Sequence, residues 1–224
     1  MAQAMRETSP GAGPATHYEF FSGLRDAQVA FLVTGAVALV LHGVPRLTPD
    51  IDLAADPDPE NLERLRRRLA GWGYGESGAE TPGARDIAIR RFRHPRSALG
   101  EIDVVIPSAR EFARLRAGAA VATLVDVGIP CVGPDDLRAL KALASSPADR
   151  EDAAGLEVLA ALHAEQPGEE TDTRREQIRK FSRWSVAARL DWLLATARLA
   201  RGLSPEARPM TRGLVRRRGW YGGR

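Results

Sequence analysis

Cysteine and histidine are scarce in this chain, and it contains no long apolar run. Among its 224 residues there is one cysteine, Cys131, and the four histidines are scattered. A single cysteine excludes an internal disulfide, and dispersed histidines disfavour a zinc centre. No apolar segment approaches the ~20 residues that a membrane-spanning helix requires. We therefore expect a cytoplasmic protein that has no membrane partner.

Charge is distributed unevenly along the chain. Residues 172–224 contain fourteen Lys or Arg against four Asp or Glu, although the whole chain has a net charge of only +3. A basic C-terminal part favours attraction to a polyanion such as RNA. The segment 216–224 interleaves arginines with Trp220 and Tyr221, as single-stranded nucleic-acid contacts often do. A solvated basic tail would have the same composition.

Acidic and apolar residues alternate in the short segment Asp50-Ile51-Asp52-Leu53. Side chains alternate across a strand, so Asp50 and Asp52 should project from one face and the apolar side chains from the other. An isolated Asp-x-Asp pattern is common in surface strands and turns. Its meaning therefore depends on the segments around it.

A second acidic strand follows later in the chain. The apolar residues of the segment Ile102 to Ile106 share one face, which leaves Asp103 on the opposite face. If this strand pairs with the first, Asp50, Asp52 and Asp103 meet at one place. Three neighbouring carboxylates repel one another, so we expect divalent cations to neutralise them. We predict these aspartates as ligands of two Mg²⁺ or Mn²⁺ ions, an arrangement used for in-line displacement at a nucleotide phosphate.

A strand-to-helix turn precedes the first acidic pair. Phe31 to Val33 is strand-like, Thr34-Gly35 ends that run, and a helical pattern starts at Ala36. Glycine allows the backbone to approach a ligand closely, and a helix N-terminus directs unpaired N–H groups at an anion. We therefore predict that Thr34, Gly35 and Ala36 bind nucleotide phosphate.

The loop between this helix and the acidic strand holds two further candidates, His42 and Arg46. The planar guanidinium of Arg46 is suited to clasp a triphosphate, although a loop arginine can equally be solvated. His42 precedes Gly43, a pattern that indicates a helix C-cap as readily as a catalytic position.

The order of these parts resembles the signature of the polymerase-beta-type nucleotidyltransferase superfamily. The signature is a Gly-Gly or Gly-Ser pair, a spacer and Asp-x-Asp; here the pair is Gly35-Ala36, the spacer is 37–49, and the acids are Asp50 and Asp52. The segment 34–53 looks most like the AbiEii-type branch, which includes toxins of bacterial toxin–antitoxin systems. The resemblance covers residues 25–165. One departure is Ala36, which stands where many relatives have Gly or Ser.

This resemblance implies a metal-dependent nucleotidyltransferase that moves NMP from an NTP (ATP, GTP, CTP or UTP) to an acceptor hydroxyl. The acceptor would be an RNA end such as tRNA, a protein or a small molecule, and a toxin would have a cognate antitoxin protein as partner. Asp50 and Asp52 would bind both metals, and Asp103 would complete one metal and help to deprotonate the attacking hydroxyl. Two alternatives stay open: a catalytically weakened binding or regulatory module, and an antibiotic-modifying enzyme, for which we expect an acidic pocket in place of a basic tail.

A second group of candidates lies on two predicted helices. The first begins at residue 134 and places Lys141 close to an apolar stripe. The stripe consists of Leu137, Leu140 and Ala144. The second helix spans 148–163 and carries Asp149 and Asp152 on its apolar side. Buried charges seldom stay unpaired, so Lys141 and Asp152 should pair with each other or contact nucleotide. The AbiEii-type pattern implies that Lys141 lies near the nucleotide and Asp152 near the catalytic centre, whereas Asp149 suits a helix cap.

The remaining patterns predict an α/β (α+β) fold with a small mixed sheet, helices on one face of it, and a helical C-terminal part. Further strands are expected at 86–93, antiparallel to the Asp103 strand, and at 121–127 and 129–132. Helices are expected at 58–71 and 181–202, with a linker at 167–170. We divide the chain into a flexible N-terminus (1–16), a catalytic domain (17–133), a helical extension that completes the site (134–166), and a basic helical region with a tail (167–224).

Overall fold

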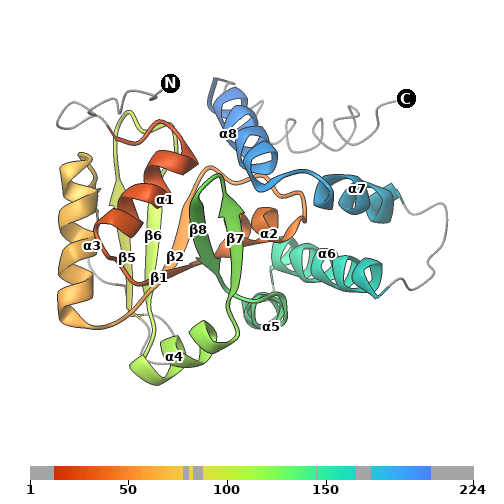
Figure 1. The fold of residues 1–224 in the computed structure, drawn as a ribbon, viewed down its shortest axis with the longest axis horizontal. Coiled ribbons are helices and arrows are strands. Elements are labelled where there is room, and N and C mark those ends of the chain that lie inside the picture. The colour runs from red at the N-terminus through yellow and green to blue at the C-terminus, as the bar shows by residue number, and fades with distance from the viewer. Residues whose placement is uncertain (1–12, 78–80, 83–87, 145, 165–172, 203–224) are drawn as a thin grey trace.

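The computed structural model describes residues 13–77, 81–82, 88–144, 146–164 and 173–202. These ranges form a mixed sheet with helices around it (Figure 1). The helices are α1 (His17–Asp26), α2 (Gly35–His42), α3 (Pro59–Gly71), α4 (Ala109–Ala117), α5 (Pro134–Ala144), α6 (Pro147–His163), α7 (Thr173–Ser182) and α8 (Val186–Gly202). The strands are β1 (Phe31–Thr34), β2 (Ile51–Ala55), β3 (Gly75–Glu76), β4 (Thr81–Pro82), β5 (Ala88–Arg93), β6 (Ile102–Ile106), β7 (Ala120–Leu124) and β8 (Val127–Cys131). None of the described helices is long and apolar enough to cross a membrane.

The sheet has the strand order β3-β5-β6-β2-β1-β8-β7, and β4 pairs with β5 beside this path. β2 is parallel to β6 and antiparallel to β1, whereas β1 is parallel to β8. β5 is antiparallel to β6, as the sequence predicts for the strand before Asp103. The predicted fold class, a mixed sheet followed by helices, is confirmed. The strand order places both acidic strands side by side in the middle of the sheet.

The two acidic strands bury one face completely. Their apolar side chains Ile51, Leu53, Ile102 and Val104 are at most 1% exposed. They belong to one core with aromatic residues of α1 and with Trp72, which follows α3. Each such side chain contributes roughly 1.5–3 kcal/mol by leaving water, so the register of these strands is firmly held. The intervening aspartates must therefore face the other side of the sheet.

α2 is a short, buried helix that connects β1 to the loop before β2. Gly43 ends it at φ 107°, and the Gly43 N–H donates to the Leu39 and Val40 carbonyls. A left-handed residue is nearly strain-free only as glycine, so the predicted C-cap is present. His42 lies half-buried, and its Nε2 is 2.8 Å from the Val132 carbonyl oxygen. Burial lowers the pKa of His42, and the neutral ring tethers α2 to the segment after β8.

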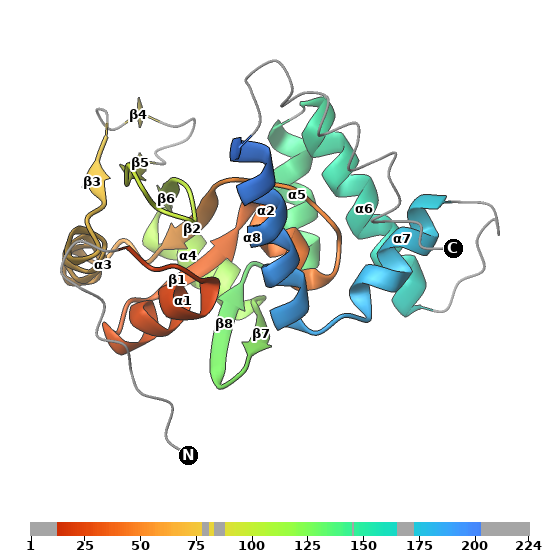
Figure 2. The same ribbon diagram turned by 90° about the horizontal axis from the view of Figure 1, so that it is seen from above.

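Of the C-terminal helices, α6 and α7 lie at the opposite end of the molecule from α3, and α8 lies between the two ends (Figures 1 and 2). The last of them, α8, is tied to α2 through Arg189, which is 9% exposed. Arg189 Nη1 donates to the Leu41 carbonyl at 2.7 Å, and Nη2 donates to the Ser182 carbonyl at 2.6 Å. Carbonyls in the last turn of a helix lack intrahelical partners, so one buried arginine satisfies the ends of both α2 and α7.

The helix predicted over 181–202 is present with its predicted end, but it starts at Val186 and not at residue 181. Phe181 belongs to the last turn of α7, and α8 begins at Val186. Between them the Trp184 N–H donates to the Phe181 carbonyl in a turn, and the Ser185 hydroxyl accepts from the Ala188 N–H. Serine competes with helical backbone pairing and favours a new N-terminus, a signal that the apolar periodicity concealed.

The apolar stripe predicted for α5 is also only partly present. Leu137 is buried at 1% exposure, but Leu140 is 37% exposed. The prediction is therefore correct for Leu137, at the start of α5, and wrong for Leu140, one turn later. Several predictions fall outside the described residues, namely the linker 167–170, the tail 216–224, the N-terminal residues 1–12 and the first part of the strand 86–93.

Candidate active site

Asp52 and Asp103 lie side by side on adjacent strands. β2 and β6 are parallel with Asp52 opposite Asp103, so both side chains project from the same face. Asp50 stands immediately before β2, and its Oδ1 accepts from the Glu101 N–H at 3.4 Å. The structure thus brings together the three aspartates that the sequence singles out.

The turn before α2 lies directly against Asp52. Gly35 has φ 61°, and a Cβ added there would lie 2.0 Å from Asp52 Oδ2. The Ala36 N–H donates to the Asp52 carboxylate, one of the amides predicted to bind phosphate. Thr34 is the N-cap residue of α2, but its hydroxyl makes no capping hydrogen bond. Only glycine fits beside this carboxylate, so turn and acid form one compact unit.

The electrostatic environment of Asp52 disfavours its negative charge. Burial raises the pKa of Asp52 to about 6, the negative charges of Asp103 and Asp50 add to the rise, and Lys141 and the Ala36 amide oppose it. Burial also raises the pKa of Asp50, with Glu101 and Asp103 contributing. A cation at this place would remove both penalties. Oxygen donors of this kind suit Mg²⁺ or Mn²⁺, so Asp50 and Asp52 fit such an ion.

Asp103 already has a cationic partner. Arg91, its cross-strand neighbour on β5, donates from Nε to Oδ1 at 2.7 Å and from Nη2 to Oδ2 at 2.9 Å. Within the described residues, no three His, Cys, Asp or Glu side chains form a ready-made metal site. The predicted three-carboxylate site therefore fits a metal at Asp50 and Asp52, whereas Asp103 would have to share its oxygens with Arg91.

Sequence reasoning missed Arg91. The signal that could have found it is the alternation in Arg91-Phe92-Arg93, where Phe92 is 4% exposed and the arginines point to the other face. Alternation alone indicates which face an arginine occupies. The register between β5 and β6, which decides that Arg91 meets Asp103, is not readable from either strand by itself.

The second group of candidates forms an ion-pair network. The Lys141 ammonium lies 3.0 Å from Asp149 Oδ1 and 2.9 Å from Asp152 Oδ2. Arg46 Nε lies 2.8 Å from the other oxygen of Asp152, which is only 2% exposed. Asp152 and nucleotide are the two partners predicted for Lys141, and the structure shows the pair with Asp152. The charge of Lys141 also lowers the pKa of Asp52, so the network lies near that carboxylate.

Asp149 has a role at the start of α6, although it is not the N-cap itself. Ser146 is the N-cap residue, and its hydroxyl accepts from the Asp149 N–H at 3.1 Å. The Asp149 carboxylate accepts in turn from the Ser146 hydroxyl. This arrangement differs from a capping box, because the Asp149 carboxylate accepts from the Ser146 hydroxyl and not from its backbone N–H, but it likewise fixes the start of α6.

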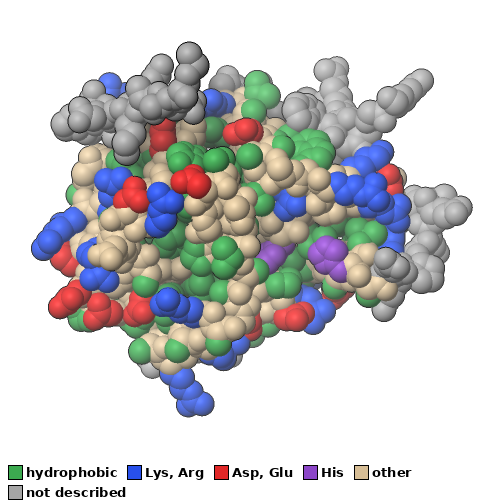
Figure 3. Space-filling view, viewed as in Figure 1, with side chains coloured by type: hydrophobic (Ala, Val, Ile, Leu, Met, Phe, Trp, Pro, Cys, Tyr) green, Lys and Arg blue, Asp and Glu red, His purple; other side chains and the backbone are tan. Residues whose placement is uncertain are grey.

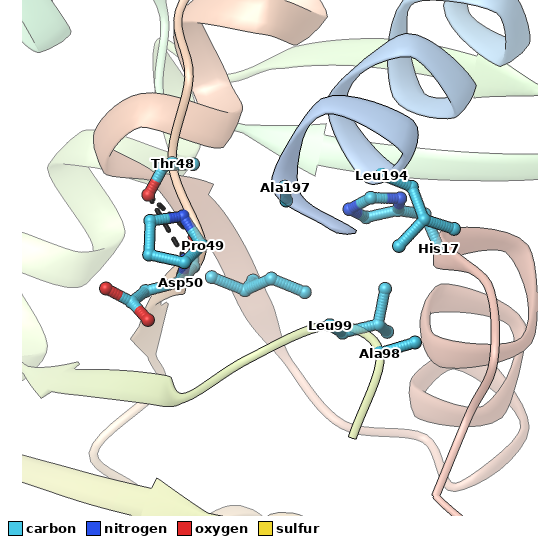
Figure 4. A pocket seen from close by; sticks show the side chains of 9 residues that line it. His17, Thr48, Pro49, Asp50, Ala98, Leu99, Leu194 and Ala197 are labelled. Carbon is cyan, nitrogen blue, oxygen red and sulfur yellow. Dashed lines mark hydrogen bonds between the residues drawn. The ribbon is translucent and has the colours of Figure 1, made fainter. Parts of the chain in front are cut away.

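A small pocket has Asp50 in its lining (Figure 4). It lies between the end of the loop before β2, α1, α8 and the segment before β6. Its lining is apolar except for Thr48, Asp50 and His17. Burial lowers the pKa of His17 to about 4, so this imidazole is neutral at physiological pH. Asp50 is therefore the only ionisable side chain of this lining that would carry charge at physiological pH.

Asp52 gives a prediction about pH. Its pKa is about 6 in the folded protein and 3.8 in the reference state, so the folded protein holds the proton more tightly. The contribution of Asp52 to the free energy of unfolding therefore falls as pH rises from about 4 through about 6, by up to about 3 kcal/mol in total. Asp52→Asn removes this titration, so its stability relative to wild type should rise by about 1 kcal/mol between pH 5 and 7. Urea unfolding of both proteins at the two pH values measures this difference, and a pH-independent difference would contradict the assignment.

The sequence matches no protein-family model and no curated protein. Among solved structures, the chain arrangement is similar to that of the lincosamide antibiotic adenylyltransferase LnuA with lincomycin bound, at TM-score 0.46 and 16% identity over 63% of this chain and 94% of that one. It is similar to ANT(2″)-Ia in complex with adenylyl-2″-tobramycin, at TM-score 0.44 and 16% identity over 71% and 92%. It is also similar to an antigenic nucleotidyltransferase-like protein from Paracoccidioides brasiliensis, at TM-score 0.44 and 14% identity over 72% and 82%. These similarities concern the path of the chain and assign no activity.

Proposed function

We propose that this protein is a metal-dependent nucleotidyltransferase that transfers NMP from an NTP to an acceptor hydroxyl. The observation that carries the proposal is the position of Asp52. It is partly buried beside Asp103, lies against the Gly35 turn, and has its pKa raised to about 6 by burial and neighbouring carboxylates. Negative charge is unfavourable at this site, so a cation would bind there, and the adjacent helix N-terminus suits the phosphates that the cation carries.

Each part of the site has a role in this reaction. Asp50 and Asp52 would hold Mg²⁺ or Mn²⁺, which, when bound, neutralises charge on the triphosphate and on the leaving pyrophosphate. The absence of a Cβ at Gly35 lets the Asp52 carboxylate lie against the start of α2, so a cation held by Asp52 would bring the triphosphate to this helix N-terminus. Asp103 would accept the proton of the attacking hydroxyl once Arg91 leaves one of its oxygens available. Lys141 would orient the triphosphate from the α5 side.

For the acceptor, we propose an RNA end such as that of tRNA. Lys and Arg side chains gather over α7, where Arg174, Arg175, Arg179 and Lys180 lie within one helix (Figure 3). This concentration of positive charge suits a polyanion better than a cationic antibiotic. The AbiEii-type resemblance of segment 34–53 leads us to propose further that the protein is a toxin with a cognate antitoxin.

One observation favours a second candidate, a nucleotide-binding or regulatory module without activity. Arg91 engages both oxygens of Asp103, the residue required as third ligand and base. The Ala36 amide is likewise engaged by Asp52. In this alternative the fold would bind NTP and metal through Asp50 and Asp52 and would transfer nothing.

Incubation with each α-labelled NTP, Mg²⁺ and either total RNA or an RNA-free protein lysate distinguishes these candidates. Label in RNA supports the proposed acceptor, and label in protein redirects the proposal to a protein hydroxyl. Triphosphate binding without label transfer supports the inactive module. Asp50→Asn with Asp52→Asn serves as the control for label transfer by contaminants.

The basic end of the chain gives a separate prediction about RNA. Deleting residues 205–224 removes six arginines as well as Trp220 and Tyr221. Each neutralised phosphate contributes a salt slope of about −0.7 for single strands, so RNA affinity should fall and the slope should flatten. Filter binding at several salt concentrations measures both quantities. Unchanged affinity and slope would exclude the tail as an RNA-recruiting element, whereas metal-dependent NTP binding should persist in the deletion variant.

A further inference from the structure

The face of the sheet that carries the aspartates also carries a row of paired charges. In one row across the strands, Asp52 lies beside Asp103, and Asp103 lies beside Arg91. In the next row, Glu101 on the segment leading into β6 pairs with Arg93 of β5, whose Nε lies 2.8 Å from Glu101 Oε1. Each acid next to β5 therefore has an arginine, whereas Asp52 on the inner strand has none at ion-pair distance among the described residues.

Arg91 makes the more complete of these two pairings. Its guanidinium contacts both oxygens of Asp103, at 2.7 and 2.9 Å, and its Nε lies 3.5 Å from Glu101 Oε2. A bidentate pair of this kind fixes the carboxylate plane as well as its charge. The side chain of Arg91 is 45% exposed, so its removal would leave no cavity. Exposed ion pairs contribute little to the free energy of unfolding. We therefore relate the two-point contact of Arg91 to the chemistry of the neighbouring carboxylates and not to stability.

We propose that Arg91 is a positioning residue that holds Asp103 as an ion pair and limits the divalent cations that the site binds without nucleotide. This inference rests on the proposed function, because it concerns the metal that Asp50 and Asp52 are proposed to hold. The guanidinium competes with a dication for the oxygens of Asp103 and repels it electrostatically. In the absence of nucleotide the site binds one cation, through Asp50 and Asp52. Asp103 becomes a ligand only when an anionic group, such as the triphosphate, draws Arg91 away.

The chain offers a matched control in Arg93. It lies on the same strand and the same face, two residues from Arg91, and it pairs with Glu101 rather than with Asp103. Arg91→Gln and Arg93→Gln therefore change the net charge equally near the site, but only the first releases the third carboxylate. Arg91→Lys keeps the charge and removes the two-point contact.

Titration of the full-length protein with Mn²⁺ in the absence of nucleotide, followed by electron paramagnetic resonance, tests the inference without any activity measurement. We expect Arg91→Gln to bind Mn²⁺ about tenfold more tightly than wild type and to take up one additional ion, because a positive charge at contact distance is removed. Arg93→Gln should behave as wild type, and Arg91→Lys should stay close to wild type because its charge remains. Circular dichroism melting checks that each variant is folded.

Equal affinity and stoichiometry in wild type and Arg91→Gln would overturn the inference, and so would an equal gain in Arg93→Gln. Adding Asp50→Asn and Asp52→Asn to the Arg91→Gln variant separates this inference from the proposed function. If those aspartates are needed for Mn²⁺ binding but Arg91 has no effect, only the role of Arg91 is rejected. If neither wild type nor Arg91→Gln binds Mn²⁺, both the role of Arg91 and the proposed metal site are rejected.

Discussion

Replacing Asp50 and Asp52 together by asparagine should reduce nucleotidyl transfer by a factor of about 10³ or more, because several kcal/mol of charge stabilisation depend on the metal that these residues hold. The same variant should lose the rise in melting temperature that Mn²⁺ with an NTP gives to wild type, since a ligand that binds only the folded state stabilises it. Label transfer and melting curves with and without Mn²⁺ and NTP measure the two effects.

The double variant should nevertheless fold well. Removing two carboxylates whose pKa values are raised, mainly by burial, relieves a penalty, so its melting temperature without metal should equal or exceed that of wild type. Asp26→Asn with Asp126→Asn is the matched control, because these acids pair with Arg25 at the surface and carry the same total charge. A metal-induced shift that persists in the Asp50 and Asp52 variant would reject the metal-site assignment.

The central part of the site was predictable because alternation and burial act together in β2 and β6. Once Ile51 and Ile102 are recognised as core residues, Asp50, Asp52 and Asp103 can only face the other side, and this prediction needs no knowledge of register. The C-cap at Gly43 was predictable for a similar reason, because helix ends depend on local chemistry. Local rules therefore gave the faces of the strands and most helix ends.

The partners of these residues were less predictable, because they depend on register and on packing between elements. Arg91 meets Asp103 only because β5 and β6 pair in one particular register. Arg46 was considered as a triphosphate ligand or a solvated residue, yet it lies 2.8 Å from Asp152, more than a hundred residues away in the chain. Such contacts are set by the whole fold, so no local pattern around Arg46 or Arg91 contains them.

Lys141 provides the second large effect, and its prediction concerns stability. Lys141→Met keeps much of the side-chain volume but leaves Asp149 and Asp152 without their shared cation. Breaking a buried ion pair from one side costs about 3–5 kcal/mol, and we expect a value in this range, near the lower end because Arg46 still neutralises Asp152. Lys180→Met is the matched control, because Lys180 pairs with Glu176 at 3.6 Å and its side chain is 55% exposed. That variant should change the free energy of unfolding by about 0.5 kcal/mol or less.

Measuring NTP affinity in the same variant decides whether the network also serves the reaction. Lys141 is near enough to Asp52 for its charge to lower the pKa of that carboxyl, so a triphosphate bound at Asp52 would lie near the ammonium. If Lys141 contacts the nucleotide, Lys141→Met should weaken NTP binding about tenfold in addition to destabilising the fold, as expected for the loss of a charged hydrogen bond. Arg46→Met, which also removes a cation from Asp152, should destabilise less because Lys141 remains in place. Destabilisation of Lys141→Met with unchanged NTP affinity would restrict Lys141 to holding α5 and α6 together, and Asp152 would then be a structural residue as well.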